Sequence, residues 1–187
     1  MKIYCAERTG MLIIPPQSFD SYNEIDNLLR YITRTKVSGN KRKDVIKIGG
    51  RAVQLSHGIE TAIRQFKQVQ SVYDNGFDRY SRHCFHEIFA FNPELSRFLS
   101  DQLVTEMAEE MSRFYWIKGF QVVYAVHKPD RENYNLHIHF AVNAISVKTG
   151  KKWHTDYNDT KYREREFQKM VTRLFNQNFA EDCDNGN

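Results

Sequence analysis

Residues 120–145 read FQVVYAVHKPDRENYNLHIHFAVNAI, and this stretch decides the fold. The runs from Phe120 to Val126 and from Leu136 to Ile145 are rich in β-branched and aromatic residues. The interval between them is polar and contains Pro129. This pattern predicts two adjacent antiparallel strands joined by a loop.

Side chains alternate between the two faces of a strand, so the second run divides into two sets. The apolar set should face the core and consists of Leu136, Ile138, Phe140, Val142 and Ala144. The other set should carry the chemistry and consists of His137, His139, Ala141 and Asn143. His127 shares this second face if the sequence numbers of two residues that lie opposite each other add to an even value. This is so, for instance, if His127 lies opposite His137 or His139.

These three histidines predict a metal site. A single histidine on a strand is usually exposed or hydrogen-bonded, and a His-x-His pair by itself is weak evidence. Here, however, three of the chain's 7 histidines fall within one predicted hairpin. The hairpin contains no cysteine, so a closed thiolate zinc site is disfavoured. Three neutral ligands leave the ion its full charge and open positions for a substrate, which favours a Lewis acid over a structural ion.

Length and composition indicate one globular domain. The chain has 187 residues, of which 41% are hydrophobic and 27% charged, enough for a single core. Its three cysteines, Cys5, Cys84 and Cys183, are odd in number and lack CxxC spacing, which predicts a reducing compartment. No run is long and apolar enough for a signal peptide or membrane span, so we expect a cytoplasmic protein.

Positive charge is concentrated between Arg30 and Arg51. This segment has eight Lys or Arg and one acid, a net charge of +7, whereas the whole chain has +4. With its glycines it is typical of a mobile loop that binds a phosphate backbone, although a solvated loop without a partner remains an alternative. The candidate DNA-binding residues are Arg30, Arg34, Lys36, Lys41, Arg42 and Lys43.

The segment from Ser21 to Arg34 predicts a helix with one candidate nucleophile. Ser21 is a potential N-cap, Glu24 occupies the capping-box position, and the apolar stripe consists of Ile25, Leu28, Leu29 and Ile32. At 3.6 residues per turn Tyr31 lies about 110° from the middle of that stripe, at its border with solvent. Tyr22 points about 180° away from Tyr31 and cannot share its site.

A border tyrosine usually serves packing, but Tyr31 directly precedes the basic segment in a chain with a predicted metal site. A tyrosine hydroxyl with a pKa of about 10 is a poor nucleophile at neutral pH. A nearby cation favours the phenolate, and a metal on the phosphate neutralises the charge that develops in the transition state. Nucleophile, metal and phosphate-binding segment are together consistent with phosphoryl transfer.

Three motifs of this sequence resemble those of the HUH endonucleases and, more narrowly, of the MOBP-type relaxases of conjugative and mobilisable elements. They are LLRYIT at 28–33, RHCFHEIFAF at 82–91, and His127 with LHIHFAVN at 136–143. The motifs come in the expected order and, with the helical tail, cover most of the chain. The nine residues between His127 and His137 are a slightly long spacing for this group.

The resemblance implies a site- and strand-specific nicking transesterase that acts at an origin of transfer and forms a covalent 5′-phosphotyrosine intermediate. Tyr31 would match the nucleophile, and His127, His137 and His139 the metal ligands. Glu87 matches an acidic position of the middle motif and could orient a ligand histidine or handle the tyrosine proton. An ordinary strand carboxylate is an equal alternative for it.

Further expectations follow from the same resemblance. Asp130 and Asn143 could provide hydrogen bonds that orient the metal ligands. Manganese or magnesium is the expected ion, although three imidazoles also suit zinc or nickel in a purified sample. The expected partners are single-stranded DNA at an origin of transfer, accessory relaxosome proteins and a coupling protein, with no membrane. The protein should be a monomer in the bacterial cytoplasm.

Three rival functions remain open at this stage. A rolling-circle replication initiator would share the chemistry, although the single candidate tyrosine favours a relaxase. A non-catalytic DNA-binding module would bind DNA without cleaving it. A small-molecule enzyme of the cupin kind also uses His-x-His on a strand, but it requires many short strands with glycine turns.

The predicted fold is α/β (α+β), with one central antiparallel sheet flanked by helices. The strands expected besides the hairpin are 1–6, 11–14 and 82–91, and the helices expected besides 21–34 are 59–73, 93–117 and 159–179. Asn92 should cap the helix 93–117, and Trp153 and Tyr157 are candidate base-stacking residues. We expect residues 1–180 to form a single domain, and 181–187 to be a polar tail that begins a linker to a further C-terminal region.

Overall fold

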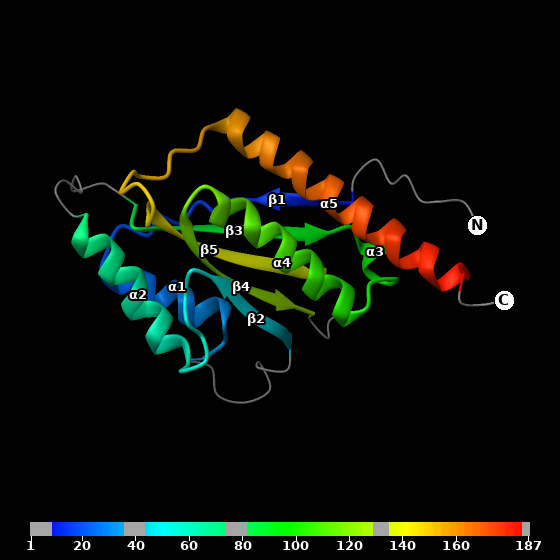
Figure 1. Cartoon of the computed structure of the whole chain (residues 1–187), viewed down its shortest axis with the longest axis horizontal. Helices are drawn as coiled ribbons and strands as arrows, with labels where there is room; N and C mark the ends of the chain where they lie inside the picture. The colour runs from blue at the N-terminus through cyan, green and yellow to red at the C-terminus, as the bar shows by residue number, and fades with distance from the viewer. Residues whose placement is uncertain (1–8, 36–43, 74–81, 129–134, 185–187) are drawn as a thin grey trace.

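The protein folds into five antiparallel strands with helices on both faces of the sheet (Figure 1). The computed structural model describes residues 9–35, 44–73, 82–128 and 135–184. Its elements are β1 (Gly10–Ile13), α1 (Tyr22–Ile32), β2 (Val45–Arg51), α2 (Ile59–Val72), β3 (Cys84–Phe91), α3 (Pro93–Ser96), α4 (Asp101–Ile117), β4 (Phe120–His127), β5 (His137–Ser146) and α5 (Tyr157–Asp184). The prediction of an antiparallel sheet flanked by helices is confirmed.

The strand order is β1-β3-β5-β4-β2, so the longest strand, β5, lies at the centre. In the β4–β5 pair His127 lies opposite His137, and Ala125 lies opposite His139. The residue numbers of these pairs add to an even value, as the alternation of side chains required. In the β3–β5 pair Ile88 lies opposite His139.

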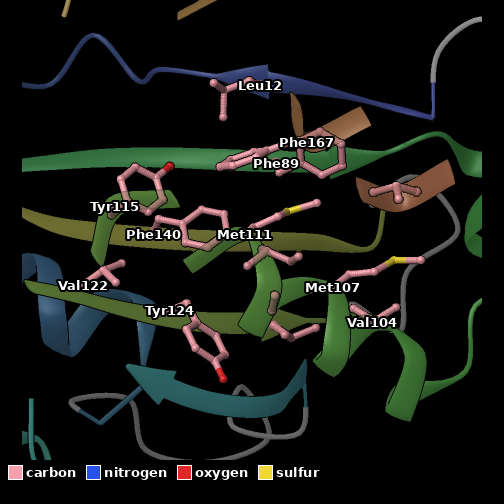
Figure 2. Close-up of a cluster of buried hydrophobic side chains, with 14 of the residues drawn as sticks. Leu12, Phe89, Val104, Met107, Met111, Tyr115, Val122, Tyr124, Phe140 and Phe167 are labelled. Atoms are coloured by element: carbon pink, nitrogen blue, oxygen red, sulfur yellow. The ribbon is translucent and has the colours of Figure 1, made fainter. Parts of the chain in front are cut away.

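One face of the sheet packs against α4 and α5. The apolar set of β5 contributes to this core, which also contains the buried side chains of Leu103, Met107 and Met111 from α4. Figure 2 shows Phe89 and Phe140 gathered with Tyr115 of α4 and Phe167 of α5. The leucines and methionines spaced four residues apart in α4 are therefore core residues, as their periodicity indicated.

The opposite face carries a second core beneath α1 and α2. The predicted stripe of α1 is buried there together with Phe66 of α2 and the small residues Val123, Ala125 and Ala141 of the sheet. The sheet face that contains the histidines, which was expected to be purely functional, is thus apolar over part of its area. Small side chains on β4 and β5 let α1 approach the sheet closely, beside the histidines.

Three predicted elements differ in the structure. The helix expected over 93–117 is two helices, because Asn92 caps α3 and the Ser100 hydroxyl accepts a hydrogen bond from the Leu103 amide at 3.1 Å to begin α4. The basic segment expected to be a loop forms edge strand β2 over 45–51. The helix α5 continues to Asp184, through part of the expected tail.

Gly49 of β2 serves close packing and not mobility. A Cβ atom at this position would overlap the ring of Tyr124, so a larger residue would displace that side chain. The strand predicted over 1–6 lies outside the described residues. No helix of the ranges described above has the length and apolar character to cross a membrane.

A buried ion pair anchors α5 to the sheet. The Arg163 guanidinium donates two hydrogen bonds to the Glu87 carboxylate, at 2.8 and 2.7 Å, and the Tyr115 hydroxyl donates a third at 2.7 Å. Both charged side chains are only 1% exposed. Such a pair depends on its geometry, because either charge alone would be buried without compensation.

We predict that Arg163→Met lowers the free energy of unfolding by about 3–5 kcal/mol, since it leaves the Glu87 carboxylate buried and unpaired. Urea unfolding followed by circular dichroism measures this. Lys169→Met on the same helix is the matched control, because Lys169 is exposed and its partner Glu166 is only half-buried; its effect should stay within about 0.5 kcal/mol. Equal effects of the two substitutions would contradict this role of the pair.

Candidate active site

The structure brings His127, His137 and His139 together on one face of the sheet. One nitrogen from each ring lies within 4.8 Å of the others. The Nε2 atoms of His137 and His139 are 3.1 Å apart, and the His127 ring centroid is 4.5 Å from that of His139. His127 and His139 are buried and His137 is half-buried, so the cluster is open to solvent on the side of His137.

Each of the three imidazoles has its other nitrogen engaged by a second group. Nε2 of His127 lies 2.6 Å from the Ile32 carbonyl oxygen, and Nδ1 of His137 lies 2.7 Å from the Asn135 carbonyl oxygen. Nδ1 of His139 lies 2.8 Å from Nε2 of His86. The nitrogens that remain for a shared ion are Nε2 of His137 and His139 and Nδ1 of His127, which Nη2 of Arg34 also approaches at 3.4 Å. Orientation of ligand histidines by such partners is usual at metal sites.

Burial keeps these imidazoles neutral. It is the main cause that lowers the pKa of His127 to about 4, and it also lowers the pKa values of His137 and His139. Proximity of the rings to one another adds to the effect at His127 and His139. A neutral imidazole offers a lone pair at neutral pH, which is the form that binds metals. The donor set therefore fits a divalent ion with three nitrogen ligands.

Tyr31 lies against this cluster. Its ring centroid is 5.7 Å from that of His139, with an interplanar angle of 77°, and the side chain is 50% exposed. Helix α1 sets this position because the buried stripe of α1 packs on the sheet and leaves Tyr31 at its border. The phenol is therefore supported on one side by an imidazole and accessible on the other.

Arg34 connects the phenol and the histidines. Its guanidinium carbon lies 5.0 Å from the Tyr31 ring centroid, and Nη2 lies 3.4 Å from Nδ1 of His127. The same nitrogen lies 3.4 Å from the Asp44 carboxylate. Arg34 has a φ of 55°, in the left-handed region, so the chain turns sharply immediately after α1 and points this cation back at the site.

His86 of β3 is a site residue that sequence reasoning missed. Its ring is nearly parallel to that of His139, with an interplanar angle of 22° and centroids 5.1 Å apart, and its centroid is 6.0 Å from that of Tyr31. Burial lowers its pKa to about 4. Alternation within the motif at 82–91 places His86 and Ile88 on one face, but only the observed pairing of Ile88 with His139 shows that this is the histidine face.

The structure places two of the predicted site residues, Glu87 and Asn143, away from the histidine cluster. Glu87 follows His86 on β3 and therefore points to the opposite face, where it binds Arg163; it contacts neither the histidines nor Tyr31. Asn143 shares the histidine face but lies four residues beyond His139, about 13 Å along the strand. Its amide bonds Gln70 and Gln121 beneath α2, so it does not orient a metal ligand.

The remaining candidates are partly outside the structure. Asp130, Lys36 and the run Lys41-Arg42-Lys43 lie outside the described residues. Arg30 is on α1 and forms an ion pair with Glu60 of α2 at 2.5 Å. Of the two candidate base-stacking residues, Trp153 is buried against Phe120, which argues against that role, and Tyr157 is exposed.

Comparison with known proteins gives a consistent result. The family model described as the nuclease domain of MobA/VirD2-like relaxases matches residues 31–176. A search of curated proteins found no match.

Two solved structures share the fold. The MobM relaxase domain (MOBV; Mob_Pre), bound to plasmid pMV158 oriT DNA and to Mn, has a TM-score of 0.58 and 13% identity, over 87% of this chain and 85% of that chain. The conjugative relaxase TrwC, in a metal-bound complex with oriT DNA, has a TM-score of 0.51 and 10% identity, over 89% of this chain and 70% of that chain.

We predict that His137→Ala weakens binding of Mn²⁺ by at least about tenfold in isothermal titration calorimetry, because the ion loses one of three nitrogen ligands. His154→Ala is the control, since His154 is exposed and is not part of the cluster. If His137→Ala kept the affinity of the unmodified protein, His137 would be removed from the ligand set.

Proposed function

Since the chain belongs to the relaxases, as a MobA/VirD2-like nuclease domain, we propose that it nicks one DNA strand at a specific site in an origin of transfer. In this proposal it stays attached to the 5′ end through Tyr31 during conjugative transfer or mobilisation. The observation that carries the assignment of Tyr31 is its contact with His139, a member of the histidine cluster, at 5.7 Å between ring centroids.

The proposed reaction is a transesterification. The Tyr31 hydroxyl oxygen attacks the scissile phosphorus and loses its proton, the Oη–P bond forms, the P–O3′ bond breaks, and the 3′ oxygen leaves with a proton as a hydroxyl. One phosphodiester bond replaces another, so the bond energy is retained. Attack by a 3′ hydroxyl on the phosphotyrosine reverses the step and rejoins the strand without ATP.

The residues around Tyr31 hold the reactants. His127, His137 and His139 would bind the divalent ion, for which we propose manganese or magnesium, and the ion would supply Lewis-acid stabilisation of the phosphate. Arg34 places a positive charge beside the phenol, where it stabilises the negative charge that develops on the transferring phosphate. The half-exposed position of Tyr31 leaves room for the strand to approach.

The rival functions are distinguished by specific observations. The open five-stranded sheet with long helices does not have the many short strands of a cupin. A rolling-circle initiator would use the same chemistry, and the family match favours the relaxase. A non-catalytic DNA-binding module would bind DNA and form no adduct. Our proposal extends to accessory relaxosome proteins, a coupling protein and action as a monomer in the bacterial cytoplasm.

We predict that Tyr31→Phe abolishes the covalent protein–DNA adduct and leaves DNA affinity within about twofold, because only the attacking oxygen is removed. Single-stranded oligonucleotides that span the transfer origin, incubated with Mn²⁺ and analysed on denaturing gels, measure the adduct. Tyr22→Phe on the same helix is the matched control and should keep full adduct formation. An adduct that persists in Tyr31→Phe would disprove the assignment, and binding by the unmodified protein without any adduct would favour the non-catalytic module.

The run Lys41-Arg42-Lys43 generates a further prediction. Neutralising it should lower affinity for single-stranded DNA of any sequence and reduce the slope of log affinity against log salt by about 0.7 for each phosphate that the run no longer neutralises. Fluorescence anisotropy across a salt series measures both quantities. Neutralising Lys151, Lys169 and Arg173 elsewhere on the surface controls for net charge. An unchanged slope in the first variant would show that the run does not bind phosphate.

A further inference from the structure

His86 is placed to decide which nitrogen of His139 binds the ion. It is 7% exposed, its ring is nearly parallel to that of His139 at 22°, and its Nε2 lies 2.8 Å from Nδ1 of His139. In the β3–β5 pair His86 lies opposite Ala141, not opposite His139. The small Ala141 side chain leaves the space in which the two rings meet diagonally across the strands.

A hydrogen bond between two neutral imidazoles has two possible arrangements. If Nε2 of His86 donates, Nδ1 of His139 accepts, and Nε2 of His139 then carries the ring proton and has no lone pair for an ion. If Nδ1 of His139 donates to Nε2 of His86, Nε2 of His139 keeps its lone pair. That atom is the one that faces Nε2 of His137 at 3.1 Å. Only the second arrangement makes His139 a ligand at the shared centre.

We propose that His86 is a positioning residue that accepts the Nδ1 proton of His139 and so holds the tautomer of His139 that can bind the divalent ion. This inference rests on the proposed metal-dependent function. It gives His86 the role that the Ile32 and Asn135 carbonyl oxygens have for the other two ligands. Each of the three proposed ligand histidines then donates its second ring proton to a neutral acceptor.

His86 also links the ligand set to the nucleophile. Its ring is held at edge-to-face angles by Phe19 on one side and Tyr31 on another, with interplanar angles of 78° and 81°. A side chain packed by three aromatic neighbours cannot rotate freely, so the acceptor nitrogen stays directed at His139. The same contact supports the phenol of Tyr31.

Two substitutions at this position separate hydrogen bonding from packing. His86→Phe keeps an aromatic ring and removes the acceptor, so the affinity for Mn²⁺, measured by calorimetry without DNA, should fall by about 10–100-fold. His86→Gln retains an acceptor oxygen and should restore most of that affinity. His83→Phe is the matched control, because His83 is also buried but bonds Gln70 and lies outside the cluster.

The outcomes are distinguishable. Unchanged Mn²⁺ affinity in His86→Phe, or an equal loss in His86→Phe and His86→Gln, would overturn the role of His86 and leave the metal centre intact. Absence of Mn²⁺ binding by the unmodified protein would instead overturn the metal centre, and this inference with it.

A second measurement does not depend on the stability of the variants. Long-range ¹H–¹⁵N NMR spectra of the unmodified protein loaded with Zn²⁺ report the tautomer of each histidine. We expect a proton on Nδ1 of His139 and the metal on Nε2. A metal-bound Nδ1 of His139 would overturn the proposal.

Discussion

The register between β4 and β5 is the constraint on which the site depends. Because strand side chains alternate, His127, His137 and His139 share a face only in registers whose paired numbers add to an even value, and the observed pairing of His127 with His137 is one of these. A shift by one residue would turn His137 and His139 into the core beneath α4 and would place the apolar set of β5 on the other face, where small residues now pack against α1. The burial of two cores, one on each face, therefore protects the histidine cluster against such a shift.

The docking of α1 brings Tyr31, the proposed nucleophile, to the histidine cluster. Successive residues of one helical turn have separate functions: Ile32 is buried and its carbonyl oxygen accepts from Nε2 of His127 at 2.6 Å, while Tyr31 projects beside His139. A helix can do this only if it lies close to the sheet, which the small residues Ala125 and Ala141 allow. The hydrophobic packing of α1 is thus what sets the distance between phenol and imidazoles.

The sequence was most informative where local periodicity determines structure. Alternation identified the three histidines and their common face, and the stripe of α1 placed Tyr31 at the border of the helix. Roles that depend on distant partners were not predictable. Glu87 binds Arg163, which lies 76 residues later, and no local pattern indicates which face of β3 its carboxylate takes. His86 was overlooked for the same reason, since its partner His139 belongs to another strand.

The net charge around the histidine cluster depends on which groups accept hydrogen bonds from the three imidazoles. The groups bonded to the second nitrogen of the three clustered histidines are two backbone carbonyl oxygens and one imidazole, so none of them adds a negative charge. The acid of the middle motif, Glu87, is neutralised by Arg163 on the opposite face. Asp44 approaches the site, but it does so as the ion-pair partner of Arg34. A centre arranged in this way keeps the positive charge of a bound ion for an anionic substrate, which is what the transfer of a phosphodiester requires.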